Sequence, residues 1–341
     1  MPTCFGVDIG NSGLRIALLD LAHRELGSML RVNWCPADSQ AIRRCSQEAD
    51  RYLPDDNAWI KHIEQFIAST APDRSLHSHR WLISSVRRDA LVVLQNYLQQ
   101  VNCHHFCHCI EVVDYTQIPL ALDVDFPERV GIDRLLAALA ATDLTASRPA
   151  IVVQAGSAVT VDLIQSWPDA PRRQAACPSP SLSPDSPSRD YVQQQSTPHT
   201  TQQHHLLGTF AGGAIVPGVP MMLRLLGKGA DQLPEIDADD LLELPKLPGK
   251  NTEEAMTCGA AFALVGGVSL LIDRYRKQYG SAVPVILSGG DGMRLAPYIP
   301  QPLIVRPHLV HRGLLKLAEL SSTVCLMDGS KRIIHPGIMH D

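Results

Sequence analysis

The chain has 341 residues, of which 45% are hydrophobic and 19% are charged, and its formal net charge is −5 at pH 7. These values are typical of a globular protein with room for two domains, and they exclude a chain that is disordered throughout. The mild negative charge argues against a protein that holds nucleic acid by bulk positive charge, so no nucleic-acid partner is expected.

The sequence predicts neither a membrane span nor an export signal. Its first residues, MPTCFGVDIG, lack a basic stretch followed by a long apolar core, and no run approaches the roughly 18 apolar residues of a span. The nine cysteines are scattered along the chain. We interpret them as reduced thiols of a cytoplasmic protein without a membrane partner.

Strands and helices are expected in two similar sets. In the first set, apolar spacing predicts strands over 4–9, 14–19, 81–86 and 110–113, and helices over 57–69 and 89–100. In the second set, it predicts helices over 133–146 and 255–275, and strands over 151–153, 158–164 and 283–287.

Each set opens with two strands around a short polar turn, which predicts an α/β protein of two domains with a cleft between them. We expect these domains over 1–125 and 126–325, followed by a tail over 326–341. Residues 166–205 contain seven Pro, seven Ser and six Gln, with few large apolar side chains. This composition predicts a disordered insertion within the second domain.

The first turn has the sequence Asp8-Ile9-Gly10-Asn11-Ser12-Gly13-Leu14-Arg15. A carboxylate at a strand end can hold Mg²⁺, and a turn of small residues lets backbone N–H groups approach phosphate oxygens. An ordinary hairpin favours the same residues, so the turn alone leaves both interpretations open. The second turn, Gln154-Ala-Gly-Ser157-Ala, has a similar form, and together the two turns could clamp a triphosphate.

The segment Gly131-Ile132-Asp133-Arg134 precedes an Ala/Leu-rich helix. Asp133 either complements the helix dipole or acts as a base toward a substrate hydroxyl, with Arg134 holding an anionic group. Thr252 begins another long helix, where it is either the N-cap or a ligand contact.

The tract from Cys103 to Cys109 contains enough Cys and His for zinc, but its spacing is not a paired CxxC. Chance composition at a helix-to-strand junction is the alternative. The sequence also lacks a P-loop, a GxGxxG motif after a strand, and protein-kinase signatures.

Taken together and in order, the motifs DIGNS, SSV, PERVGIDR, QAGSAVTVD, GGAIVPG and NTEEA resemble those of the type III pantothenate kinases of coenzyme A synthesis. The resemblance covers most of residues 4–325 outside the insertion. It implies the actin-like ATPase fold, with two ribonuclease-H-like domains, and a homodimer. It also implies that ATP phosphorylates pantothenate to 4′-phosphopantothenate, with Mg²⁺ or another divalent cation and activation by K⁺ or NH₄⁺.

The resemblance also implies roles for residues at matching positions. Asp133 corresponds to the proton acceptor, and Asp8 to the Mg²⁺ ligand. The ATP contacts would be Asp8, Ile9, Gly10, Asn11, Ser12, Gly13, Leu14, Arg15 and Ser157. The pantothenate contacts would be Val124, Gly131, Ile132, Asp133, Arg134 and Thr252.

Two positions depart from the family pattern. Gln154 stands where the family has the Asp that binds the monovalent cation, so we expect weak or absent K⁺ activation. Val124 stands where a Tyr lines the pantothenate pocket, so contacts to the substrate should differ there. The alternatives to a pantothenate kinase are a catalytically impaired relative with an accessory role and a kinase of another small hydroxy acid.

Overall fold

The computed structural model describes residues 3–34, 58–70, 78–102, 107–145, 148–165, 206–236 and 244–327. The first part of the chain forms β1 (Thr3–Ile9), β2 (Gly13–Asp20), β3 (Glu25–Asn33), α2 (Ala58–Thr70), β4 (Ser78–Ser85), α3 (Arg88–Asn102), β5 (Cys107–Val112) and η1 (Tyr115–Gln117). The insertion expected over 166–205, and all but the first two residues of the expected tail, lie outside the described residues.

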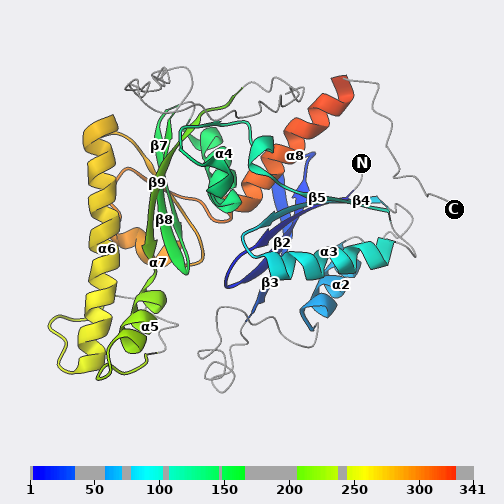
Figure 1. The fold of residues 1–341 in the computed structure, drawn as a ribbon. Helices are drawn as coiled ribbons and strands as arrows, with labels where there is room; N and C mark the ends of the chain where they lie inside the picture. Colours follow the sequence, from blue (N-terminus) through cyan, green and yellow to red (C-terminus); the bar gives the residue numbers. More distant parts are fainter. Residues whose placement is uncertain are drawn as a thin grey trace, which may run out of the picture.

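The second part of the chain forms another set of elements, coloured from green to red in Figure 1. They are β6 (Ala121–Leu122), η2 (Pro127–Arg129), α4 (Ile132–Leu144), β7 (Ala150–Ala155), β8 (Ala158–Gln165), β9 (Thr209–Pro217), α5 (Val219–Gly229), α6 (Thr252–Tyr279), β10 (Val285–Ser288), α7 (Gly292–Leu295), η3 (Ala296–Tyr298), β11 (Leu303–Val305) and α8 (Leu309–Met327).

The two sheets repeat one strand order. The first is β3-β2-β1-β4-β5, and the second is β9-β8-β7-β10-β11 with β6 added beside β9. In each sheet the first three strands of the unit are antiparallel, and the last two run parallel to the first. This repeat confirms the expected fold class, an α/β protein built from two ribonuclease-H-like units.

Helices α4 and α8 lie between the two sheets (Figure 1). Their apolar side chains form one continuous core with the facing sides of both sheets, including Leu82 of the first and Val152 of the second. The outer face of the first sheet is covered by α2 and α3, and that of the second by α6. The two units are therefore joined by a shared core.

Several elements were not predicted, namely β3, β9, α5, β11 and α8. In α8, eight of the ten residues from Leu309 to Ala318 are buried, so no clean amphipathic stripe marks the helix. In β9, two adjacent glycines interrupt the alternation of apolar and polar side chains.

Helix α6 corrects one expectation from the sequence. Among the described residues, α6 is a helix that is both long enough and apolar enough to cross a membrane, judged by length and composition. Of its most apolar 18-residue segment, 33% is buried. Its Val268 and Ile272 are fully buried in the core beside the second sheet. This criterion alone does not separate a membrane span from a core helix, so the absence of a membrane partner stays a prediction.

Candidate active site

The turn between β1 and β2 is the tight hairpin turn that the sequence predicts. Gly10 N donates to Gly13 O at 2.9 Å, and Asn11 and Ser12 are exposed at its tip. The neighbouring apolar residues of the motif, Ile9 and Leu14, are fully buried in the core of the first unit. The strands thus anchor the turn while its polar tip stays accessible.

Asp8 and Arg15 lie opposite each other at the base of this turn, in register on β1 and β2. Arg15 Nη1 lies 3.7 Å from Asp8 Oδ2, and the Asp8 side chain is only 11% exposed against 32% for Arg15. His311 of α8 contacts the backbone of Arg15, with its Nε2 3.3 Å from Arg15 O. Asp8 is therefore a nearly buried carboxylate with one partly exposed cation beside it.

The turn between β7 and β8 is built differently. Gly156 N donates to Ala158 O at 3.2 Å, and Gly218 N donates to Ser157 O at 3.0 Å. A Cβ at Gly218 would lie 2.7 Å from both Gly156 O and Ser157 O. Only a glycine can therefore bring the end of β9 this close to the second turn.

The two turns meet across the units. Ser12 Oγ and Ser157 Oγ are within hydrogen-bonding distance of each other, although they are 145 residues apart in sequence. We call the group formed by Asp8, Ser12, Arg15, Asp133 and Ser157 the polar junction.

Asp133 enters the polar junction from the first turn of α4. Its Oδ1 accepts a hydrogen bond from Arg134 N at 2.9 Å. A Cβ at Gly131 would lie 2.5 Å from that same oxygen. A side chain at position 131 would therefore displace the carboxylate, which explains the glycine before this helix.

The charge of Asp133 acts on the carboxyl group of Asp8. Burial, and after it the charge of Asp133, raise the pKa of Asp8 to about 7, and Arg15 opposes this rise. Burial also raises the pKa of Asp133, against the hydrogen bond from Arg134 N. Two partly buried acids that repel each other form a donor set that a divalent cation would stabilise.

Arg134 points into the second unit. Its Nε lies 3.1 Å and 3.2 Å from the two carboxylate oxygens of Asp162, which is fully buried on β8. Its guanidinium also lies 5.5 Å from the ring centroid of Phe210. Burial raises the pKa of Asp162, and Arg134 opposes that rise by hydrogen bonding and charge. The structure thus gives Arg134 an internal partner, and its expected contact with a pantothenate carboxylate stays a prediction.

The other expected pantothenate residues are spread over the second unit. Val124 packs against the shared core near Gly212, and Ile132 is buried in that core. Thr252 is exposed and is not the N-cap of α6, because Asn251 caps that helix by accepting from Glu254 N at 2.8 Å. The start of α6 lies beside α5 and away from α4 (Figure 1). This end of α6 therefore packs on α5, and the contact of Thr252 with pantothenate stays a prediction.

Gln154 occupies the position equivalent to Asp8. Each lies two residues before the glycine of its turn, and each pairs in register with a serine of the neighbouring parallel strand. The Nε2 atom of Gln154 is buried and has no hydrogen-bond partner among the described residues. A buried amide donor suits an acceptor such as a phosphate oxygen better than it suits a cation.

The zinc tract is only partly described. Residues 103–106 lie outside the described residues, and Cys109 is an exposed free thiol. Where the chain is described, no group of three or more His, Cys, Asp or Glu side chains is placed to hold a metal ion.

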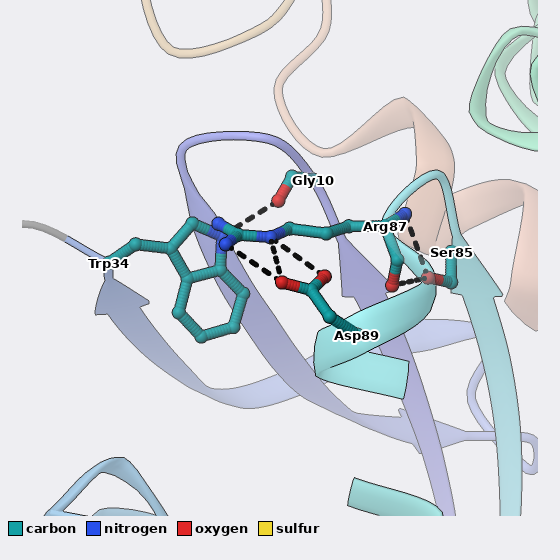
Figure 2. A network of polar contacts seen from close by, with 5 residues as sticks. All are labelled: Gly10, Trp34, Ser85, Arg87 and Asp89. Atoms are coloured by element: carbon teal, nitrogen blue, oxygen red, sulfur yellow. Dashed lines mark hydrogen bonds and ion pairs between the residues drawn. The ribbon is translucent and has the colours of Figure 1, made fainter. Parts of the chain in front are cut away.

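Sequence reasoning missed two sets of residues near the turns. Gly289, with φ of +97°, approaches the second turn so closely that a Cβ would lie 2.0 Å from Ala155 O. The pair of glycines after a buried strand was the available signal for this contact. Trp34 and Arg87 pack behind the first turn (Figure 2), and no sequence signal connects them to it.

The duplicated topology and the polar junction indicate a kinase of the actin-like ATPase class. A model of the type III pantothenate kinase family matches residues 4–168 and 202–274. The chain therefore belongs to the type III pantothenate kinase family.

Individual relatives agree with this family. The chain is 28% identical over 326 residues to a type III pantothenate kinase of Rhodopirellula baltica, covering 92% of this chain and 97% of the relative. It is 29% identical over 198 residues to that of Albidiferax ferrireducens, covering 57% and 60%. Among solved structures, it is similar to MreB5 of Spiroplasma citri bound to ADP, with a TM-score of 0.40, 10% identity, and 97% and 99% of the two chains covered.

Proposed function

We propose that this protein transfers the γ-phosphate of ATP to the hydroxyl of pantothenate, the first step of coenzyme A synthesis. The observation that carries the proposal is the meeting of the two hairpin turns at Ser12 and Ser157, with the carboxyl groups of Asp8 and Asp133 beside them. Phosphoryl transfer depends mainly on positioning and on electrostatic stabilisation, and this junction offers groups for both.

The two turns would hold the phosphates. The Asn11 N–H at the tip of the first turn is a donor for phosphate, and the hydroxyls of Ser12 and Ser157, which contact each other in the structure, would turn toward it from both units. Arg15, partly exposed beside Asp8, adds positive charge next to the transferred group. Asp8 is the residue that would hold Mg²⁺, which supplies charge neutralisation on the phosphates when bound.

Asp133 would accept the proton of the pantothenate hydroxyl. Burial raises its pKa, and a carboxylate with a raised pKa is a stronger base in its ionised form. The hydrogen bond from Arg134 N fixes its orientation at the start of α4. Val124, Gly131, Ile132, Arg134 and Thr252 are the proposed surroundings of pantothenate.

The protein would act as a cytoplasmic homodimer. Large apolar side chains are exposed on α5 and on α6, including Leu225 at 60% and Leu270 at 55%. An exposed apolar surface of this kind is typical of a contact between subunits. A dimer would also be one way to bring Thr252 to a substrate, because α6 begins away from α4 within one chain.

The proposal is tested by complementation of a bacterial strain that lacks pantothenate kinase. We expect the wild-type chain to restore growth and the Asp133→Asn variant, expressed to the same level, to fail. If the wild-type chain restores growth but shows no ATP-dependent phosphorylation of pantothenate in vitro, an accessory role is indicated. Phosphorylation of another hydroxy acid, but not of pantothenate, would assign the same site to a different substrate.

A further inference from the structure

Trp34 holds the first turn at two points. It follows β3, its side chain is buried, and its indole Nε1 donates to Gly10 O at 2.9 Å. Its backbone N also donates to Ser12 O at 3.1 Å. Both carbonyl groups that contact Trp34 belong to the turn between β1 and β2, and Figure 2 shows the indole beside the Gly10 carbonyl.

The hydrogen bond from the indole fixes the direction of one N–H group at the tip of the turn. In a planar trans peptide, the carbonyl and the following N–H point to opposite sides. Because Gly10 O points toward the indole, the N–H of Asn11 points away from it. Ser12 O, in contrast, is held by the backbone N–H of Trp34, so a substitution of the side chain leaves that bond in place. The indole of Trp34 therefore sets the orientation of the Asn11 amide, in the turn that would receive phosphate oxygens.

Arg87 in turn holds the indole. Its guanidinium lies 5.3 Å from the Trp34 ring centroid, within the range of a cation–π interaction. Asp89 binds it from the side, with Nε to Oδ1 at 2.9 Å and Nη2 to Oδ2 at 3.0 Å. Ser85 Oγ donates to Arg87 O at 2.9 Å and accepts from Arg87 N at 3.1 Å. The backbone and side chain of Arg87 are thus both fixed (Figure 2).

A purely structural role would not require this arrangement. The Arg87 side chain is only 8% exposed, and burial of a charged group is unfavourable unless it is paired. An apolar side chain would pack against the indole without that cost. The network places a buried cation directly behind the turn, and the ion pair with Asp89 offsets the cost of burying it.

We propose that Trp34 and Arg87 are positioning residues for ATP: Arg87 orients the indole, and the indole, through Gly10 O, fixes the Asn11 amide of the Gly10–Gly13 turn toward the phosphates. This inference rests on the proposed function, because it assigns the phosphates of ATP to that turn. Neither side chain needs to touch the nucleotide.

The first test replaces Trp34 by Phe, which retains an aromatic ring but removes the indole N–H. We expect the KM for ATP to rise about 3–10-fold, the usual effect of losing one hydrogen bond, with the KM for pantothenate unchanged. Trp59→Phe is the matched control, because Trp59 is equally buried and contacts Trp34 edge-on at 5.7 Å between ring centroids. It should lower the melting temperature similarly without changing the KM for ATP.

The second test asks whether Arg87 acts through Trp34. Arg87→Met keeps an unbranched side chain against the indole but removes the charge and the planar group. Alone it should raise the KM for ATP severalfold, and in the Trp34→Phe background it should add little, because residues that act through one another are not additive.

The outcomes separate this inference from the proposed function. A wild-type protein that binds no ATP in calorimetry would remove the proposed function itself. If the wild type phosphorylates pantothenate but Trp34→Phe and Trp59→Phe have the same KM for ATP, only the positioning role is overturned. Full additivity of Trp34→Phe and Arg87→Met would likewise show that Arg87 does not act through the indole.

Discussion

The two hairpin turns at the junction have the same backbone plan but are held by different means. In the first unit, Ile9 O accepts from Val86 N at 3.0 Å, and in the second unit Ala155 O accepts from Asp291 N at 3.1 Å. Each donor lies in the loop that follows the neighbouring parallel strand. The carbonyl before the turn glycine is therefore fixed in the same way in both halves.

Beyond that shared contact the two turns diverge. The first is held from behind by the Trp34 side chain and carries the carboxylate of Asp8. The second is enclosed by close backbone at Gly218 and Gly289 and carries the neutral Gln154. A turn can thus be fixed by side chains or by backbone contact. The first turn depends on Trp34, and the second depends on Gly218 and Gly289. The difference also places an ionisable carboxyl group in only one of the two turns.

The largest effect is expected outside both turns. If the turns bind phosphate and Asp133 carries out the proton transfer, Asp133→Asn should lower kcat by about 10²–10⁴-fold while the fold survives. Asp143→Asn is the control, because Asp143 lies on the same helix but is 63% exposed and pairs with Lys316. Near-normal turnover of Asp133→Asn would remove Asp133 as the base.

The charge difference between the turns is tested at Gln154. Two unit charges 4 Å apart attract by about 4 kcal/mol at an effective dielectric of 20, so loss of a carboxylate should weaken a monovalent-cation site by orders of magnitude. We expect turnover of the wild type to be almost insensitive to KCl and NH₄Cl in a Na⁺ buffer. Gln154→Asp should gain saturable activation, and strong K⁺ activation of the wild type at low millimolar concentration would contradict this expectation.

The backbone difference is tested at equivalent positions, Gly289 in the second unit and Ser85 in the first. Gly289→Ala introduces a Cβ 2.0 Å from Ala155 O at a φ of +97°, and should lower the free energy of unfolding by about 2–4 kcal/mol. Ser85→Ala removes two hydrogen bonds to Arg87 and should cost about 1 kcal/mol. Urea unfolding measures both free energies. Equal losses in the two variants would show that the two turns are not held by different means.

The smallest effect is a difference in pH dependence caused by Asp8. Its pKa of about 7 in the folded protein exceeds the ordinary value of 3.8, because of burial and the charge of Asp133. The folded state therefore keeps this proton where the unfolded chain has lost it. The resulting stability is complete below about pH 4 and is lost as the pH rises through 7.

This pH dependence is measured without divalent metal. Between pH 5 and pH 6.5 the wild type should lose about 2 kcal/mol more stability than Asp8→Asn, at roughly 1.4 kcal/mol per pH unit. Asp162 and Arg15 are the same in both proteins, so the comparison measures Asp8 together with its coupling to Asp133. Identical pH profiles would show that Asp8 is ionised in the folded protein throughout this range.

The sequence predicts those parts of the molecule in which local pattern and tertiary structure agree. The β1–β2 and β7–β8 hairpins, and α4 with Gly131 before it, follow from apolar spacing and turn residues. Helix α8 could not be predicted as readily, because it is buried between two sheets on most of its surface.

The candidate site was predictable to a similar extent. Asp8, Asp133 and Ser157 were identified from ordered motifs, but sequence spacing cannot show that Arg134 pairs with Asp162, 28 residues away. The contact of Trp34 with Gly10 is also non-local, since it joins positions 24 residues apart through a side-chain N–H. Such contacts depend on how β3 and the loop after β4 pack, which no local pattern encodes.

The central claim is that both turns and Asp133 act together on ATP and pantothenate. The most direct measurement incubates the purified full chain with ATP labelled in the γ-phosphate, pantothenate and Mg²⁺, and follows the label by mass spectrometry. The account predicts that the label appears on pantothenate in a 1:1 ratio with ADP, and that Asp133→Asn slows this transfer by at least about 100-fold. A folded wild-type protein that binds ATP but leaves pantothenate unlabelled would contradict it.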